Sequence, residues 1–252
     1  MIMYKLALDF PIKYIDSTLG DMTFALAPLC NDEEYVTKLK KIKQSGRPIL
    51  MDNGAYELGK SIPAEEYLKI IKKVKPTYAV IPDVLQDGFR TCIEASKFIS
   101  QRLPTDVQWI FAPQGSDPKE MLNCWDTICG ESHEDFILGL PKHVGDWTNR
   151  AKLALMLWEE SFYKFSKIHL LGFNTEEFGI IRDLRVEGLP DEKFEVISID
   201  TKWPIKNMIP KRYKFKNHID YYYYDKGLDM QELDYKVRGF KLAIEGKVGM
   251  RE

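Results

Sequence analysis

The chain has 252 residues, of which 44% are hydrophobic and 29% are charged, and its formal net charge is −2 at pH 7. This composition is typical of a soluble globular protein with a large core. No apolar stretch approaches the ~20 residues that are needed to span a bilayer, and the N-terminal residues lack the features of a signal peptide. The sequence therefore argues against a membrane-spanning protein, and we expect a cytoplasmic location.

Short apolar runs recur along the chain, and six of them end in an acid, an amide or a glycine. The six end residues are Asp52, Asp83, Gln114, Gly139, Gly172 and Asp200. Successive end residues lie 25 to 33 residues apart, which is about the length of one strand, one helix and two loops. This spacing predicts an α/β fold, a TIM-type (β/α)8 barrel that forms a single domain over residues 1–252. We expect residues 23–29 to form the first strand and the aromatic-rich residues 214–224 to form the eighth.

Helices are predicted between these strands. Acidic residues at positions 32–34 begin the first helix, in which apolar residues recur at helical spacing from Tyr35 to Ile42. The later predicted helices cover residues 63–74, 88–101, 118–129, 146–162, 175–184 and 230–245. No linker, low-complexity tract or internal repeat interrupts this pattern, so we expect one domain.

The cysteines and histidines are scattered along the chain. The four cysteines are Cys30, Cys92, Cys124 and Cys129, and none belongs to a Cys-x-x-Cys pair. Because disulfide frameworks and zinc sites need clustered ligands, we expect buried thiols, no metal and no cofactor. His169 lies inside a predicted strand, where a hydrogen-bonded structural histidine is expected.

Three of the predicted strands end in carboxylates, Asp52, Asp83 and Asp200. A barrel brings the carboxyl ends of all its strands to one rim, so these side chains are expected to meet there. Glycosyl transfer needs paired carboxylates, because one attacks or stabilises the anomeric carbon while another handles the proton of the leaving group. The alternative is that each aspartate only caps the helix after its strand. Since three of them occur within recurring motifs, we favour the catalytic interpretation.

Other residues at the strand ends suit a nucleobase. Gly54 allows a tight turn with close backbone approach, and the amide of Gln114, before Gly115, offers both donors and an acceptor to a base edge. Gly139 and Leu140 could offer backbone hydrogen-bond groups and an apolar surface to the base. Each of these signals is weak alone, because glycine at a strand end is usually only a turn residue.

In combination, these motifs resemble the queuine tRNA-guanine transglycosylase superfamily, and in particular its short DNA-acting branch, the DpdA-like deazaguanine transglycosylases without a zinc subdomain. The resemblance covers roughly residues 51–203. The segment 52–57, Asp-Asn-Gly-Ala-Tyr-Glu, is similar to the Asp-Ser-Gly-Gly-Phe-Gln motif of the tRNA enzymes. The resemblance implies that Asp52 is the acid/base and sugar-positioning aspartate, and that Asp200 is the nucleophile that attacks C1′.

The resemblance also implies which residues contact the base. Asp83 would recognise the base, Gln114–Gly115 would read it, backbone groups of Gly139–Leu140 would meet it, and Leu171–Gly172 would form an apolar lid over it. The base then leaves, and a free deazaguanine base or a water molecule resolves the intermediate.

A basic segment follows Asp200. Its cationic residues, with no acid between positions 201 and 219, are Lys202, Lys206, Lys211, Arg212, Lys214 and Lys216. Such a run beside a nucleophile suits the phosphates of a nucleic acid, and Trp203, Tyr213 and Phe215 could stack on bases. The alternative is a solvated loop. No cysteine follows Asp200 to form the zinc subdomain of the tRNA enzymes, so we expect DNA rather than tRNA as the partner, and no membrane.

Three functions stay open. The first is a DNA base-exchange enzyme that replaces guanine with a 7-deazaguanine. The second is a DNA glycosylase of the same scaffold, which would excise a base, for example a modified base of phage DNA in phage defence, and leave an abasic site. The third is a non-catalytic nucleic-acid-binding subunit, against which the presence of both Asp52 and Asp200 counts.

Overall fold

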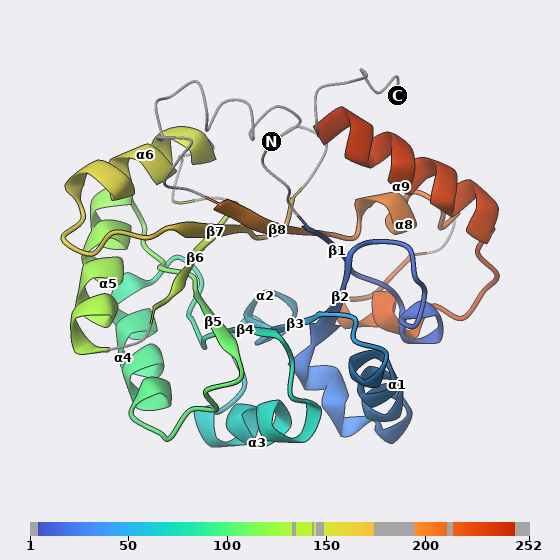
Figure 1. The fold of residues 1–252 in the computed structure, drawn as a ribbon, viewed down its shortest axis with the longest axis horizontal. Coiled ribbons are helices and arrows are strands. Elements are labelled where there is room, and N and C mark those ends of the chain that lie inside the picture. Colours follow the sequence, from blue (N-terminus) through green and yellow to red (C-terminus); the bar gives the residue numbers. More distant parts are fainter. Residues whose placement is uncertain are drawn as a thin grey trace.

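The computed structural model describes residues 5–132, 135–142, 144, 149–173, 195–210 and 214–244. Eight parallel strands form one closed barrel, in which each strand pairs with the next and β8 pairs with β1 (Figure 1). The strands are β1 (Lys5–Leu8), β2 (Met22–Leu26), β3 (Ile49–Asp52), β4 (Tyr78–Val80), β5 (Gln108–Phe111), β6 (Ile137–Leu140), β7 (Lys167–Leu170) and β8 (Glu195–Thr201). The predicted (β/α)8 barrel is confirmed.

The barrel begins one strand earlier than the sequence predicts. The predicted first strand, residues 23–29, is β2, because β1 precedes it, and the strand that contains Asp200 is therefore the eighth. β1 has four residues, the same length as β3, and its apolar run before Asp9 is a signal of the same kind that the prediction leaves out.

The prediction of a strand over residues 214–224 is wrong. This segment contains a 3-10 helix, η4 (Ile219–Tyr223). Tyr221, Tyr222 and Tyr224 are buried, whereas Tyr223 is 56% exposed. Adjacent buried tyrosines fit a tight helical turn and not the two-residue alternation of a strand.

Helices surround the ring of strands, except the short α2 (Ala55–Leu58), which lies within the outline of the ring in this view (Figure 1). They are α1 (Glu33–Gln44), α2 (Ala55–Leu58), α3 (Ala64–Val74), α4 (Gly88–Ile99), α5 (Pro118–Glu131), α6 (Arg150–Glu160), α8 (Trp203–Lys206) and α9 (Met230–Ile244). All the helices predicted within the described residues are present, with ends that differ by a few residues. The helix predicted at residues 175–184 lies outside the described residues, as does the start of the one predicted at 146–162. The short helices α2 and α8, which directly follow Asp52 and Asp200, are not apparent from periodicity.

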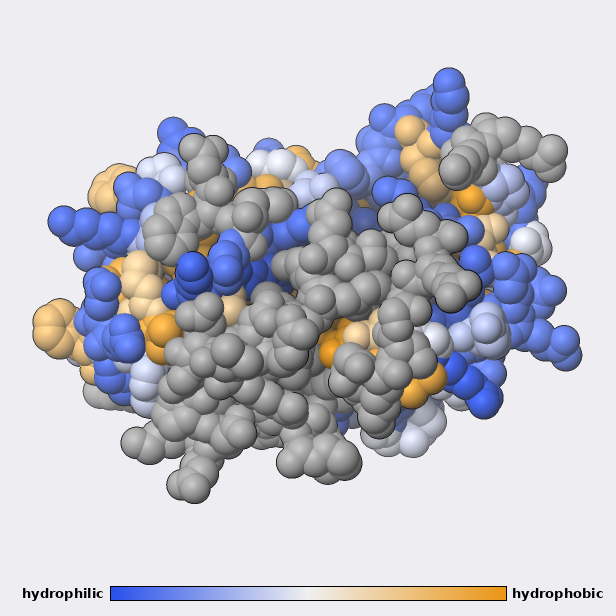
Figure 2. Space-filling model, turned by 90° about the horizontal axis from the view of Figure 1, so that it is seen from above, coloured by the Kyte–Doolittle hydropathy of each residue, from blue (hydrophilic) through white to orange (hydrophobic). Residues whose placement is uncertain are grey.

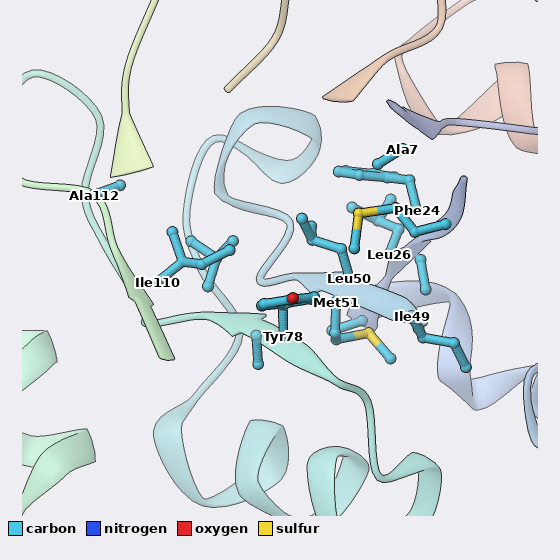
Figure 3. Packing of buried hydrophobic residues seen from close by; sticks show 14 of the residues in the cluster. Ala7, Phe24, Leu26, Ile49, Leu50, Met51, Tyr78, Ile110 and Ala112 are labelled. Carbon is cyan, nitrogen blue, oxygen red and sulfur yellow. The ribbon is translucent and has the colours of Figure 1, made fainter. Parts of the chain in front are cut away.

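The core is formed by the apolar side chains of the strands and the inner faces of the helices. In Figure 3, residues such as Phe24, Leu50, Tyr78 and Ile110, from four neighbouring strands, gather in one cluster. The coloured surface in Figure 2 is mostly hydrophilic, with hydrophobic residues in scattered patches. Among the described helices, none is both long enough and apolar enough to cross a membrane.

The turn after β3 needs a glycine at position 54. Gly54 has a φ of +82°, and a Cβ atom there would lie 2.4 Å from Cγ of Pro28. Gly46 has the same φ of +82°, but a Cβ atom there would meet nothing within 4 Å. The two glycines thus share the left-handed backbone and differ in the space around them.

We expect Gly54→Ala to lower the free energy of unfolding by roughly 1–3 kcal/mol more than Gly46→Ala does, because overpacking against Pro28 adds to the backbone strain that both variants carry. Urea unfolding of the two variants measures the difference. Equal losses would show that the contact with Pro28 relaxes without cost.

Candidate active site

The carboxyl ends of β3, β4 and β5 share a buried hydrogen-bond network. Asn53 Nδ2 donates to Asp83 Oδ1 at 2.8 Å, and Gln114 Nε2 donates to Asp83 Oδ2 at 2.6 Å. Gln114 Oε1 accepts from the backbone N–H of Gln86 at 3.1 Å, which fixes the orientation of the Gln114 amide. Burial raises the pKa of Asp83 to about 6, although the hydrogen bonds from Asn53 and Gln114 oppose this shift. The structure therefore brings the predicted base-site residues Asp83 and Gln114 together and adds Asn53 to them.

Asp200 is held by donors from β7 and from the turn after it. His169 Nε2 lies 3.0 Å from Asp200 Oδ1, and the backbone N–H of Gly172 donates to both carboxylate oxygens at 3.0 and 3.1 Å. His169 Nδ1 lies 2.7 Å from Ser198 Oγ. Because a carboxylate accepts, His169 donates to Asp200 from Nε2, and its Nδ1 shares a hydrogen bond with the Ser198 hydroxyl. Ser198, His169 and Gly172 together fix the orientation of the Asp200 carboxylate.

His169 is hydrogen-bonded, as expected for a histidine inside a strand, but its partner is the candidate nucleophile. The sequence analysis did not place His169 in the site. The signal that could have revealed it is a polar side chain in an otherwise apolar strand, next to a strand in which Ser198 and Asp200 lie two residues apart and so face the same side.

Asp52 ends β3 and holds the turn that follows. Its Oδ1 accepts from the backbone N–H of Gly54 at 2.7 Å. Burial, together with the nearby Glu57, holds the pKa of Asp52 well above its usual range, and Asp83 and Asp200 act in the same direction. Asp52 therefore keeps its proton to a higher pH than an ordinary aspartate, which suits a general acid.

The helix-cap interpretation does not apply to Asp83 or Asp200. The side chains that cap the described helices α1, α4, α5 and α6 belong to Asp32, Asp87, Asp117 and Asn149. Asp83 instead bonds to two amide side chains, and Asp200 bonds to His169 and Gly172.

A further group of charged residues, the Asp9 cluster, lies at the ends of β1 and β8. It consists of Asp9, Glu57, Lys202 and Tyr222. The Tyr222 hydroxyl donates to Asp9 Oδ2 at 2.9 Å and lies 3.5 Å from Glu57 Oε1. Lys202 Nζ lies 3.8 Å from Asp9 Oδ2 and 3.6 Å from Glu57 Oε1.

Burial dominates the titration of the Asp9 cluster. It raises the pKa of Asp9 to about 7, although Lys202 and Tyr222 oppose it, and Glu57 and Asp200 raise this pKa further. Burial also acts against the charged form of Lys202, but Asp9 and Glu57 outweigh it, so the pKa of the Lys202 ammonium is raised.

Asp9 is missing from the residues predicted as functional. It follows the apolar run Leu6-Ala7-Leu8 and so has the same pattern as the other strand-end acids. The pattern is missed because the predicted barrel starts with the next strand.

The described lysines of the basic segment lie in different environments. Lys202 lies in the Asp9 cluster, with its ammonium 5.3 Å and 5.7 Å from the ring centroids of Tyr221 and Tyr222. Lys206, Lys214 and Lys216 are exposed to solvent, whereas Lys211 and Arg212 lie outside the described residues. Contact of this segment with phosphates stays a prediction.

The predicted backbone contacts to a base lie in a tightly packed region. A Cβ atom on Gly139 would lie 2.9 Å from Cγ2 of Ile110, and one on Gly115 would lie 2.6 Å from the backbone nitrogen of Met121. Both glycines are therefore required for packing, and their contact with a base stays a prediction.

Arg150, the first residue of α6, forms hydrogen bonds with backbone carbonyl groups close to Asp200. It is buried and donates to the carbonyl oxygens of Leu140 at 3.3 Å and Leu171 at 2.7 Å. These bonds fix the turn whose Gly172 N–H contacts Asp200. The sequence analysis did not identify Arg150, because a single arginine at a helix start carries no special signal.

Comparison with known proteins gives no family: no family model matches the chain, and no curated protein matches it. Within the described ranges, no group of three or more His, Cys, Asp and Glu side chains is arranged to hold a metal ion. Cys30 and Cys124 are buried, and Cys92 and Cys129 are half-buried.

The raised pKa of Asp9 predicts a pH-dependent stability. Well below pH ~4, Asp9 is protonated in the folded and unfolded chains alike. As the pH rises to 7, Asp9 of the unfolded chain loses its proton first, because its pKa is lower there. The free energy of unfolding therefore falls by up to about 4 kcal/mol over this range. We expect the uncharged Asp9→Asn variant to escape this loss and to gain stability relative to wild type between pH 4 and pH 8. Urea unfolding at both pH values measures this, with Asp106→Asn at an exposed position as the control. A pH-independent difference would contradict the assignment.

Proposed function

We propose that this protein is an enzyme that opens the N-glycosidic bond of a nucleobase in DNA, with Asp200 as the nucleophile. The observation that carries the proposal is the arrangement around Asp200: a carboxylate fixed by His169 and Gly172 lies at the same barrel mouth as the proton-retaining Asp52 and the amide–acid network of Asp83. These are the parts that a double displacement at C1′ requires.

The hydrogen bonds indicate which oxygen of Asp200 attacks. Oδ1 accepts from His169 and from Gly172, whereas Oδ2 accepts only the longer bond from Gly172 among the described residues. Oδ2 is therefore the freer oxygen, and it would form the bond to C1′ while Asp52 gives its proton to the departing base.

The network of Asn53, Asp83 and Gln114 suits the edge of a base. Both Asp83 oxygens already accept one bond each, and their remaining lone pairs, with the second amide hydrogen of Gln114, offer an acceptor and a donor side by side. Tyr56 is 59% exposed and could stack on a base that is flipped out of the duplex.

Two outcomes of the reaction use the same residues. In base exchange, which the family resemblance implies, a free 7-deazaguanine base attacks the Asp200 intermediate; in base excision, water attacks it and leaves an abasic site. Mass spectrometry of the bases released from cellular and phage DNA, with and without added deazaguanine, distinguishes the two. A non-catalytic nucleic-acid-binding subunit would release no base in either assay.

Asp200→Asn is expected to abolish base release, with a loss of several orders of magnitude in rate, because the amide cannot form the glycosyl ester. Release is measured by mass spectrometry, and thermal unfolding checks that the variant is folded. Asp87→Asn, at the cap of α4, is the control, because it alters a helix cap and should change stability by only ~1 kcal/mol. A folded Asp200→Asn variant with near-normal release would remove Asp200 from the mechanism.

Base choice and DNA affinity are expected to separate in different variants. Asp83→Asn and Gln114→Ala should change which base is released, because a lost bidentate contact is worth ~1–3 kcal/mol. Charge reversal of the exposed Lys206, Lys214 and Lys216 should weaken binding to all DNA sequences alike and reduce its salt dependence. Release assays and salt titrations of binding measure the two effects. The opposite pattern would mean that base pocket and phosphate surface are assigned the wrong way round.

A further inference from the structure

One oxygen of the Asp9 carboxylate lies buried without a donor. Oδ2 accepts from the Tyr222 hydroxyl, but Oδ1 receives no hydrogen bond from any residue that the structure describes. Asp9 is only 4% exposed. An orphaned carboxylate oxygen at such depth is costly, so it indicates a site for a donor from a water molecule or ligand.

Lys202 lies next to the same carboxylate, with its ammonium 3.8 Å from the other oxygen, Oδ2. This distance and the 3.6 Å to Glu57 are longer than hydrogen bonds, so the ammonium donates directly to neither carboxylate and can donate to an additional oxygen. A bound oxygen there would accept from Lys202 and donate to Asp9. A water molecule does both.

Barrel closure places this site beside Asp200. Ala7 of β1 lies opposite Asp200 of β8, and the backbone N–H of Asp9 donates to the carbonyl oxygen of Thr201 at 3.1 Å. Asp9 follows Ala7 by two residues, so its side chain leaves the same face of the strand, and strand spacing puts the Cα atoms of Asp9 and Asp200 about 8 Å apart. This separation accommodates a sugar bound to Asp200 and a water molecule next to it.

We infer that Asp9 and Lys202 bind the water that hydrolyses the Asp200–sugar intermediate, and that Asp9 is its general base. This inference rests on the proposed function and completes it as base excision. The water oxygen forms a bond to C1′ as the bond between C1′ and Asp200 breaks. The water proton passes to Asp9 Oδ1, Asp200 regains its negative charge, and the abasic sugar leaves with a hydroxyl group at C1′.

Asp9→Asn is the direct test, because the amide keeps the shape of the side chain and cannot accept the proton. On fragmented cellular and phage DNA that the wild-type protein deglycosylates, the variant should release about one base per protein in a burst. Steady-state turnover should fall by on the order of 10²–10⁴-fold, which is the usual contribution of a general base. The Asp200–sugar adduct should accumulate and be detected by mass spectrometry of the Asp200 peptide after nuclease digestion.

Asp106→Asn is the control, because it removes a carboxylate at an exposed position outside the Asp9 cluster and should not accumulate the adduct. Lys202→Met removes the other contact to the water and should accumulate it, which keeps the test valid if Asp9→Asn fails to fold. Adding the released base to the trapped adduct should consume it, since ionised Asp52 can take the proton of the incoming base.

The outcomes separate the two hypotheses. Wild-type turnover in a folded Asp9→Asn variant, or loss of its burst, would overturn the inference and leave the proposed function standing. An adduct in Asp106→Asn of the same amount would also overturn it, since the effect would then not belong to Asp9. Absence of base release by the wild-type protein would overturn both.

Discussion

The pairing of β1 with β8 is the constraint on which the site depends. It closes the barrel and sets Ala7 opposite Asp200, so that Asp9 and Lys202, from the two ends of the chain, reach the same mouth. On its other side, β8 pairs with β7, whose His169 meets Asp200. The candidate nucleophile is therefore fixed by both neighbouring strands, and its surroundings exist only in the closed barrel.

The concentration of acids at this mouth works against stability. Burial raises the pKa values of Asp9, Asp52 and Asp83, and nearby acids add to the shifts of Asp9 and Asp52, so the folded protein holds these groups at a cost in free energy at neutral pH. Exposed ion pairs such as Lys226–Asp225 contribute little in compensation. Buried acids with raised pKa values are typical of functional sites, since the ability to hold and release protons near neutral pH is what they supply.

The sequence predicts the architecture well because the barrel repeats one pattern, and it places Asp52, Asp83, Gln114 and Asp200 at one mouth because each lies at or just after the carboxyl end of a recognisable strand. It fails where a run is left out or where the signal depends on a partner. The run Leu6-Ala7-Leu8 is not counted as a strand, although β1 is as long as β3, so Asp9 is missed with it. The hydrogen bond between His169 and Asp200 arises only when β7 and β8 pair. Lys202 belongs by sequence to a basic run, and only the fold reveals that its neighbours are acids.

The charge of Asp200 couples the two proton-handling acids. Burial is the main cause of the raised pKa values of Asp52 and Asp9, and the charge of Asp200 adds to both, so a neutral ester at Asp200 would remove this contribution and act to lower both pKa values. In the proposed reaction, Asp52 would give its proton to the departing base, and Asp9 would release its own proton to solvent before it accepts one from the attacking water. When the ester is cleaved, Asp200 would regain its charge, Asp9 would hold the proton of the water, and Asp52 would take up a proton from solvent. The same electrostatic repulsion that destabilises the fold would thus link the proton transfer at base release to the proton transfer at hydrolysis of the intermediate.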